Sequence, residues 1–293
     1  MNVGFRRLRT RLLVSFTVMV ALLQAVGFAI VNQTHQRNAR ETIAVELATG
    51  QRVFERLLAA MRDQLVQSAT AMAADAGLRE AVATRDAPTI ESALRNHGQR
   101  LGADVAMLLG HEGRIEVDTL DARRRGERFP LTDLPDGGRD SGSPSAIIVL
   151  GSRAYQFALV PIRTPRAAGW IAVGARIDDA FAASLKQLSG LDVSIYGQPD
   201  GRAPVDLAST LTPKKRAALV EALRGQALHG SQQMRLALDD DDYESRVAIV
   251  AARGDARFYA VLQRSLDEAL AAFDRLRIFL LLLALVSLPL AAA

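Results

Sequence analysis

A run of twenty uncharged residues, 12–31, constrains the fold of this chain more than any other feature. It reads LLVSFTVMVALLQAVGFAIV, with Gln24 as its one strongly polar member. A helix of about 20 apolar residues crosses a hydrocarbon core of roughly 30 Å. Four arginines precede the run within residues 1–11, and the next Arg or Lys is Arg37. This asymmetry predicts a transmembrane helix whose N-terminus lies in the cytoplasm.

A cleaved signal peptide is the alternative for residues 12–31, because a basic tip followed by an apolar run is also its signature. Signal cores are typically only about 7–15 residues long, and such peptides end at a small-x-small cleavage site. No clean site of that kind follows Val31. We therefore favour the membrane helix.

A second apolar run, 278–293, reads IFLLLLALVSLPLAAA. We expect a second transmembrane helix that is cut short, because Arg275 and Arg277 precede it and no basic cluster follows. A hydrophobic C-terminal anchor is the alternative. With two spans, residues 32–277 all lie on the outer side of the membrane, and we expect any output domain beyond Ala293.

The charge balance excludes one class of partner. The chain has 36 Lys and Arg against 32 Asp and Glu, and the whole excess lies in the first eleven residues. A nucleic-acid partner is not expected, because neutralising phosphates needs a basic face on the folded domain. The absence of cysteine excludes disulfides, cysteine nucleophiles and thiolate metal sites.

Residues 32–77 predict one long helix. The segment 33–76 has no proline, and its apolar residues recur at heptad-like spacing. These stripe residues are Ile43, Leu47, Phe54, Leu58, Met61, Leu65 and Met72. Two uses of the stripe are open, packing on the chain's own domain and pairing with a second copy, and the expected assembly is a homodimer. The charged residues between them, Arg62 included, are interpreted as a solvated face.

Two α/β modules follow the long helix, at 78–188 and 189–262. The first has five short strands, at 103–109, 114–118, 146–150, 153–162 and 169–177, and then a helix at 178–188 that Asp178 or Asp179 caps. The second has strands at 191–196, 233–238, 243–251 and 257–262 and a helix at 213–224. From Leu262 the pattern predicts a connector helix, 263–277, that leads into the second span. The fold class is α+β, with two stacked PAS-like modules and antiparallel sheets on a helical spine, flanked by two transmembrane helices.

The search for catalytic chemistry returns no site. The four histidines include no pair at the spacing of a helical metal site, and the chain has no GxxxxGK[ST], GxGxxG or GxSxG motif. The run Asp239–Asp242 resembles a calcium loop less than a solvated hairpin turn, since it lacks the glycine and the alternating ligands. We expect no enzyme activity, no cofactor and no metal in these residues.

The stretch after the long helix resembles a known family. Asp75, Leu78–Val82, Asp86, Thr89–Ile90, Ser92–Leu94, Asn96–Gly98, Arg100 and Ala103–Asp104 are similar to the double Cache sensory region of bacterial transmembrane receptors. The resemblance is greatest to regions that precede HAMP linkers and diguanylate cyclase or phosphodiesterase outputs. It implies a periplasmic ligand-sensing input region in the inner membrane, with cyclic di-GMP turnover as the output. Other members of the family feed histidine kinases or chemotaxis signalling.

The ligand site is predicted from the residues, because the amino-acid-binding pattern of the family fails here: Ala168 stands where that pattern has an arginine before Trp170. Strand alternation places Arg153 and Tyr155 on one face, and Trp170 starts a strand whose small residues leave room for a ligand. Arginine suits an anion or a carboxylate. Core aromatics and a surface ion pair are the alternative for these residues.

Arg100 and Asp104 are further candidate ligand contacts, or an internal ion pair between helix and sheet. The function expected for the whole region is therefore small-molecule sensing. The alternative is a scaffold that dimerises or senses a partner protein without a ligand.

Overall fold

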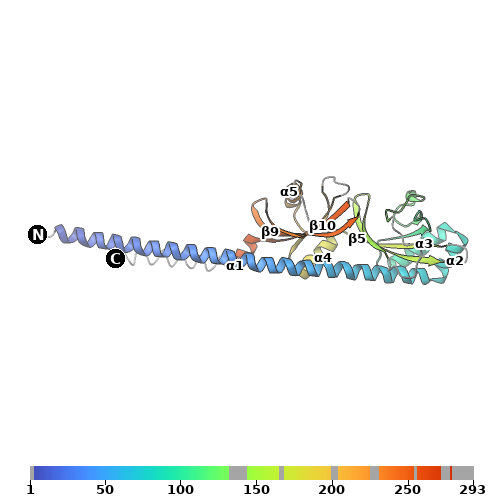
Figure 1. Ribbon diagram of the computed structural model, residues 1–293, viewed down its shortest axis with the longest axis horizontal. Coiled ribbons are helices and arrows are strands. Elements are labelled where there is room, and N and C mark those ends of the chain that lie inside the picture. Colours follow the sequence, from blue (N-terminus) through green and yellow to red (C-terminus); the bar gives the residue numbers. More distant parts are fainter. Residues whose placement is uncertain are drawn as a thin grey trace. The chain divides into compact units, whose positions relative to one another are not determined.

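The structure, a computed structural model, describes residues 3–131, 144–164, 168–198, 204–224, 231–253, 256–271 and 278. Within these ranges three helices are followed by groups of two or three strands, which single helices separate (Figure 1). The helices are α1 (Val3–Ala74), α2 (Ala76–Thr84), α3 (Ala87–Leu101), α4 (Asp179–Ser189), α5 (Pro213–Leu223) and α6 (Leu266–Ala271), with a 3-10 turn η1 (Ala122–Arg124).

The long N-terminal helix is α1, which runs unbroken for 72 residues. It includes the predicted span 12–31 and most of the helix predicted at 32–77. It ends earlier than predicted, because Asp75 is extended (ψ 126°) and its carboxylate accepts a 2.8 Å hydrogen bond from the Leu78 N–H. That bond caps the first turn of α2, so the same residue ends one helix and begins the next.

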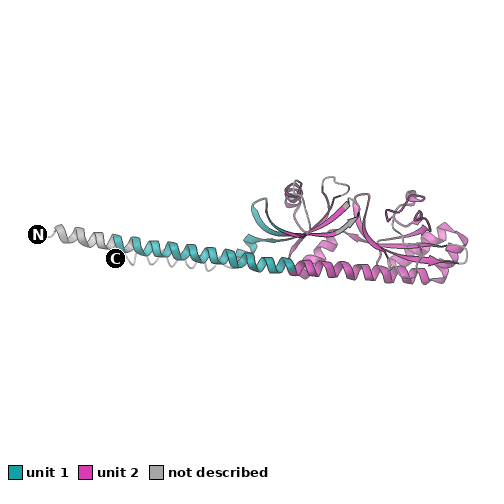
Figure 2. Ribbon diagram, in the orientation of Figure 1, with its two compact units in different colours: residues 1–48, 233–245, 263–293 teal, residues 49–232, 246–262 magenta. Residues whose placement is uncertain are grey.

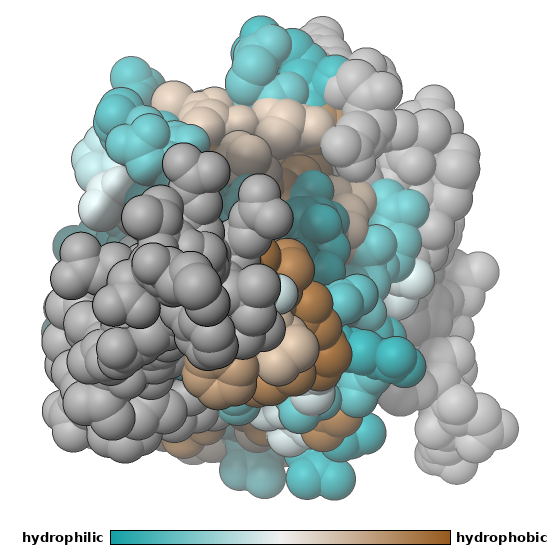
Figure 3. Space-filling model, turned by 90° about the vertical axis from the view of Figure 1, so that its left-hand side faces the viewer, coloured by the Kyte–Doolittle hydropathy of each residue, from teal (hydrophilic) through white to brown (hydrophobic). Residues whose placement is uncertain are grey.

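The first part of α1 exposes its apolar side chains. One helix of the described residues, within Val18–Ala74, is long and apolar enough to cross a membrane. Figure 3 views the molecule from the side where Figure 1 places the start of α1, and it shows apolar side chains at the surface. The exposed apolar residues of this part are Phe16, Val18, Met19, Leu22, Leu23, Val26 and Ile30. The predicted second span, 278–293, lies outside the described residues except for Ile278.

Sheet 1 has five antiparallel strands in the order β2-β1-β5-β4-β3. Its strands are β1 (Val105–Gly110), β2 (Ile115–Asp118), β3 (Ser145–Leu150), β4 (Arg153–Arg163) and β5 (Ala168–Ile177). All five coincide closely with the predicted strands, and β1 and β2 form the predicted hairpin, with Leu108 opposite Val117. Short apolar runs and the turn residues between them therefore sufficed to predict these five strands.

Sheet 2 repeats this order as β7-β6-β10-β9-β8. Its strands are β6 (Asp192–Gln198), β7 (Val205–Ser209), β8 (Gln232–Leu238), β9 (Asp241–Arg253) and β10 (Ala256–Ser265). Four of them were predicted, whereas β7 was not. β7 is a short edge strand of five residues with Asp206 as its second residue, so its alternation is too weak to read from the sequence.

The structure differs from the prediction at the start of the connector helix, 263–277. Residues up to Ser265 belong to β10, which lies between β6 and β9 and is held extended by both neighbours. The helix α6 begins only at Leu266, where the Ser265 hydroxyl accepts a hydrogen bond from the Glu268 N–H. Residues 272–277 lie outside the described ranges.

The chain divides into two compact units (Figure 2). Unit 1 comprises residues 1–48, 233–245 and 263–293, and unit 2 comprises 49–232 and 246–262. In unit 2, one face of sheet 1 packs on α1, α2 and α3 through residues such as Leu65, Leu78 and Leu94. We call this the helix face. The opposite face, here called the loop face, packs on Phe129 and Leu131 from the segment after η1.

The apolar stripe of α1 packs against other parts of the same chain. Of its seven residues, Ile43, Leu47, Phe54, Leu65 and Met72 are buried within this single chain. The structure therefore shows the first of the two predicted uses, packing on the chain's own domain. Asp239 and Asp240 form a tight turn between β8 and β9, with Asp239 in the left-handed region (φ +60°), and Asp241 and Asp242 begin β9, so the run lies in a hairpin turn as predicted.

Candidate functional site

The loop face of sheet 1 carries two of the predicted ligand residues. Tyr155 is fully buried on β4, and Trp170, at the start of β5, is 8% exposed. Phe157 lies between them in the same apolar cluster and meets the Phe129 ring edge-on, with centroids 5.2 Å apart. The predicted alternation is confirmed, and both aromatic residues are packed into the core of unit 2.

The Tyr155 hydroxyl is the polar exception on this face. It is buried and has no hydrogen-bond partner among the described residues. A buried polar group without a partner costs roughly 1–3 kcal/mol, so a hydroxyl kept there favours a further polar partner. Tyr155 therefore stays a candidate for ligand contact.

The room predicted beside Trp170 is filled in the described structure. A Cβ added at Gly174 would lie 2.7 Å from Val105 Cγ1 and 2.8 Å from Phe157 Cε1. The small residues of β5 thus admit side chains of neighbouring strands rather than a ligand. Arg153, the first residue of β4, is exposed at the end of this face.

Arg100 and Asp104 do not form the predicted ion pair. Asp104 Oδ2 accepts a 2.7 Å hydrogen bond from the Arg176 backbone N–H, and its other oxygen lies 3.9 Å from the Arg176 guanidinium. The Arg100 Nε donates instead to the Asn96 carbonyl within α3. Asp104 therefore links the start of β1 to β5, because the backbone pairing of these strands brings Arg176, not Arg100, against it.

A buried ion pair lies at the end of β2 and was not predicted from the sequence. The Asp118 side chain is fully buried, its Oδ2 lies 3.4 Å from Arg124 Nη2, and its Oδ1 accepts a hydrogen bond from the Leu120 N–H. Burial raises the pKa of Asp118, while the Leu120 bond and Arg124 oppose that shift. The pair therefore links η1 to β2 of sheet 1.

A second ionic cluster lies under α5. Arg216 contacts Asp179 Oδ2 at 2.9 Å and Asp206 Oδ2 at 3.6 Å. Burial raises the pKa of Asp206, which Arg216 partly offsets. Burial also raises the pKa of the neighbouring Tyr196 phenol far above its ordinary value. This cluster joins α4, α5 and β7 within unit 2. Among the described residues, no three His, Cys, Asp or Glu side chains are grouped to hold a metal ion.

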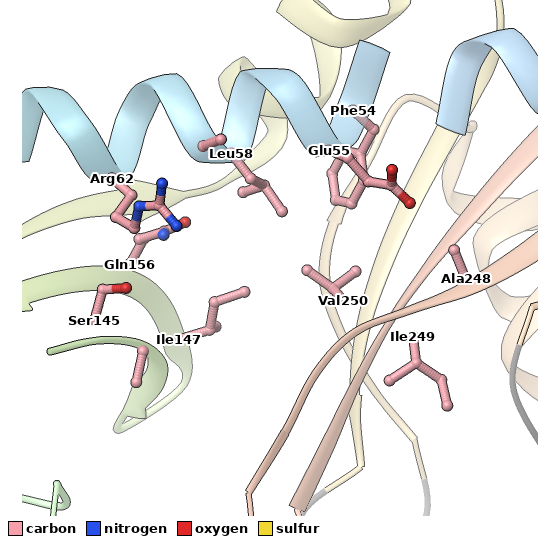
Figure 4. A pocket seen from close by; sticks show the side chains of 12 residues that line it. Phe54, Glu55, Leu58, Arg62, Ser145, Ile147, Gln156, Ala248, Ile249 and Val250 are labelled. Atoms are coloured by element: carbon pink, nitrogen blue, oxygen red, sulfur yellow. The ribbon is translucent and has the colours of Figure 1, made fainter. Parts of the chain in front are cut away.

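A cavity of about 280 Å³ lies in unit 2, between α1, β3, β4 and β9 (Figure 4). Apolar side chains form its middle, among them Leu58 and Val250. Arg62 lies beside Gln156 at one end of the lining, and Glu55 lies beyond Leu58, short of Ala248 and Ile249 (Figure 4). The cavity is thus an apolar slot with a basic group at one end and an acidic group on the far side of its middle.

Gln156 was not predicted as a site residue. It stands on the helix face of β4, between Ala154 and Ala158, and is only 7% exposed. Its Oε1 is buried and has no hydrogen-bond partner in the part of the chain that the structure describes. A lone amide in an otherwise apolar strand was the available signal in the sequence, but only the fold places it beside Arg62.

Comparison with known proteins agrees with this architecture. The family described as "Double sensory domain of two-component sensor kinase" matches residues 40–270, which include all ten strands. No curated protein matches the chain.

Several solved structures are similar at low identity. The ligand-binding domain of the Campylobacter jejuni chemoreceptor Tlp3, in complex with 4-methylisoleucine, is 12% identical, covers 80% of this chain and 94% of its own, and has a TM-score of 0.46. The periplasmic domain of Vibrio cholerae LuxQ is 14% identical, with coverages of 74% and 100% and a TM-score of 0.48. The sensor domain of the V. cholerae histidine kinase DctB is 13% identical, with coverages of 79% and 99% and a TM-score of 0.46. On its family match, which confirms the double Cache resemblance, the chain belongs to the double sensory domains of two-component sensor kinases.

Proposed function

We propose that residues 32–277 are the extracytoplasmic input region of a bacterial inner-membrane receptor that senses a small molecule. The observation that carries this proposal is the family match across both five-stranded sheets. The exposed apolar side chains of α1 support the membrane anchor, because seven large apolar residues between Phe16 and Ile30 are exposed on a helix long and apolar enough to span a bilayer. A second membrane helix at 278–293 is part of the proposal.

The ligand is proposed to reach the loop face of sheet 1, with Tyr155, Trp170 and Arg153 as contacts. The unpartnered Tyr155 hydroxyl supports this, and the exposed Arg153 offers a charge for an anion or carboxylate. Arg100 and Asp104 are less suited, because Asp104 already accepts the Arg176 N–H.

Signalling requires that the ligand distinguish two states of the receptor. A ligand shifts such an equilibrium only by the difference between its affinities for the two states. We propose that this bias passes through α6 and the second span to a cytoplasmic output. The family description favours a histidine kinase as that output, and cyclic di-GMP turnover is the alternative from the sequence resemblance.

The test uses the full chain in lipid nanodiscs and a panel of carboxylates, amino acids, amines and purines. Trp170 is the only tryptophan, so its fluorescence reports the melting of sheet 1. A true ligand raises the melting temperature progressively with concentration, by an amount equivalent to about 2.7 kcal/mol at a hundredfold excess over Kd.

Tyr155→Phe locates the site. The variant removes the buried hydroxyl and keeps the ring, so the ligand-free protein should be as stable as the unaltered chain or more so. Its ligand-induced shift should fall, whereas Lys214→Gln, far along the sequence on α5, should leave the shift unchanged. A compound whose shift survives both Tyr155→Phe and Arg153→Ala would contradict the site, and a flat panel would favour the ligand-independent scaffold.

A further inference from the structure

The cavity beside Gln156 lies on the helix face of sheet 1, whereas the residues of the proposed ligand site lie on the loop face. Its lining comes from three parts of unit 2: α1, the neighbouring strands β3 and β4, and residues 248–250 of β9. A volume of about 280 Å³ is at the lower end for a small-molecule site. A second ligand would therefore have to be small.

The polar groups of the cavity define what such a ligand must carry. Glu55 and Arg62 are seven residues apart on α1, which is about two turns, or roughly 10 Å along the helix. Leu58, on the same helix face between them, and Val250 line the apolar middle (Figure 4). A complementary ligand is linear, with a cationic end, an apolar body and an anionic end.

Gln156 adds a requirement at the anionic end. Its buried Oε1 lacks a donor, and its side chain lies beside Arg62 (Figure 4). The ligand should thus present an N–H group next to its anionic group. A peptide C-terminus has this arrangement, because the last amide N–H is separated from the carboxylate by a single Cα.

We propose that this cavity binds a peptide of two or three residues with apolar side chains. An extended chain spans about 3.3–3.6 Å per residue, so a tripeptide covers the roughly 10 Å between Glu55 and Arg62. A dipeptide is shorter, and the two charged side chains would have to reach toward its ends. The C-terminal carboxylate meets Arg62, the last amide N–H donates to Gln156 Oε1, and the N-terminal ammonium meets Glu55. Arg62 also binds Asp63, through Nε and Nη2 at 3.0 Å, so the carboxylate of Asp63 competes with the ligand.

The experiment is isothermal titration of the full chain in nanodiscs with Ala-Leu and Ala-Leu-Ala. Free leucine, the N-acetylated peptides and the C-terminal amides are the comparison compounds. At least one free peptide should bind, more tightly than free leucine. Each capped form should bind up to about fivefold more weakly than its free peptide, as expected for a half-exposed charge pair.

The variants separate binding from folding. Gln156→Leu should lower the affinity for the peptide about tenfold. It should leave the melting temperature unchanged or raise it, because it removes a buried unpartnered amide oxygen. Asp63→Asn should strengthen binding about threefold by freeing Arg62, a gain that misfolding does not produce. In Glu55→Gln the N-acetylated and free peptides should bind alike. Arg62→Gln should weaken peptide binding up to about fivefold, and Arg56→Gln, on α1 but outside the cavity lining, is its matched control.

Two results overturn the proposal. The first is no binding of either peptide at millimolar concentration. The second is equal affinity for the unaltered chain and for Gln156→Leu. The proposed sensing function fails separately, since it depends on a compound whose thermal shift is lost in Tyr155→Phe rather than in Gln156→Leu.

Discussion

Asp118 is the residue whose environment most clearly predicts a pH effect. Burial raises its pKa above the ordinary 3.8, so the folded chain holds this proton more tightly than the unfolded chain does. The free energy of unfolding therefore loses a contribution as the pH rises from below 3.8 through the raised pKa. Asp118→Asn does not titrate and keeps an Oδ1 for the Leu120 N–H.

We expect the stability of Asp118→Asn relative to the unaltered chain to improve between pH 3 and pH 7. Urea midpoints at several pH values, followed by Trp170 fluorescence, measure this difference. Glu112→Gln, which also replaces a carboxylate by an amide but at an exposed position, is the control. Parallel profiles for Asp118→Asn and the unaltered chain would show that burial does not disturb this carboxyl.

Gly174 is a second residue with a sharp expectation. Its missing Cβ makes room for Val105 and Phe157, so Gly174→Ala forces both core side chains to move and should cost about 1–3 kcal/mol. Gly98→Ala is the contrast, because its Cβ would meet nothing closer than 3.8 Å in the interior of α3. That change should stabilise by roughly 0.5–1 kcal/mol. Thermal melts of both variants test these two expectations. Similar melting temperatures would contradict the close packing at Gly174.

At the scale of elements, the start of α4 depends on one cap. The Asp178 carboxylate accepts hydrogen bonds from the N–H groups of Ala180 and Phe181, at 3.1 and 3.2 Å. Asp178→Ala should cost about 1 kcal/mol of unfolding free energy, and Asp178→Ser should recover most of it. Chemical denaturation of the two variants tests the cap. An alanine variant as stable as the serine variant would mean that α4 is held by packing alone.

The helices and strands also show where sequence patterns suffice. All five strands of sheet 1 were predicted, because each is a short, mostly apolar run bounded by turn residues. The edge strand β7 and the extended end of β10 were not, because their conformation is set by pairing with neighbouring strands. At the break after Ala74, the Leu78 N–H donates a hydrogen bond to the Asp75 carboxylate. Such a bond can be identified only in the folded structure.

For the whole molecule, the membrane topology is the testable property. Because the chain has no cysteine, one introduced cysteine is a unique label. We expect Gln64→Cys, exposed on α1, to react with a membrane-impermeant maleimide in intact spheroplasts. Thr10→Cys should react only after the membrane is opened, since four arginines hold that end in the cytoplasm. Labelling of both positions before lysis would exclude the proposed orientation.

The sequence by itself determined the kind of molecule. The uncharged run 12–31, the proline-free heptad stripe and two sets of alternating strands each act through local periodicity, which needs no knowledge of distant contacts. The family resemblance at residues 75–104 led to the same architecture, and the family match confirms it.

The tertiary structure alone decided which side chains meet. Strand register placed Arg176 rather than Arg100 against Asp104, and packing filled the space above Gly174 with Phe157. It also left Gln156 buried without a donor, next to a cavity that begins on a helix a hundred residues earlier in the chain. Such meetings depend on long-range pairing and on side-chain volume. Neither leaves a periodic signal in the sequence.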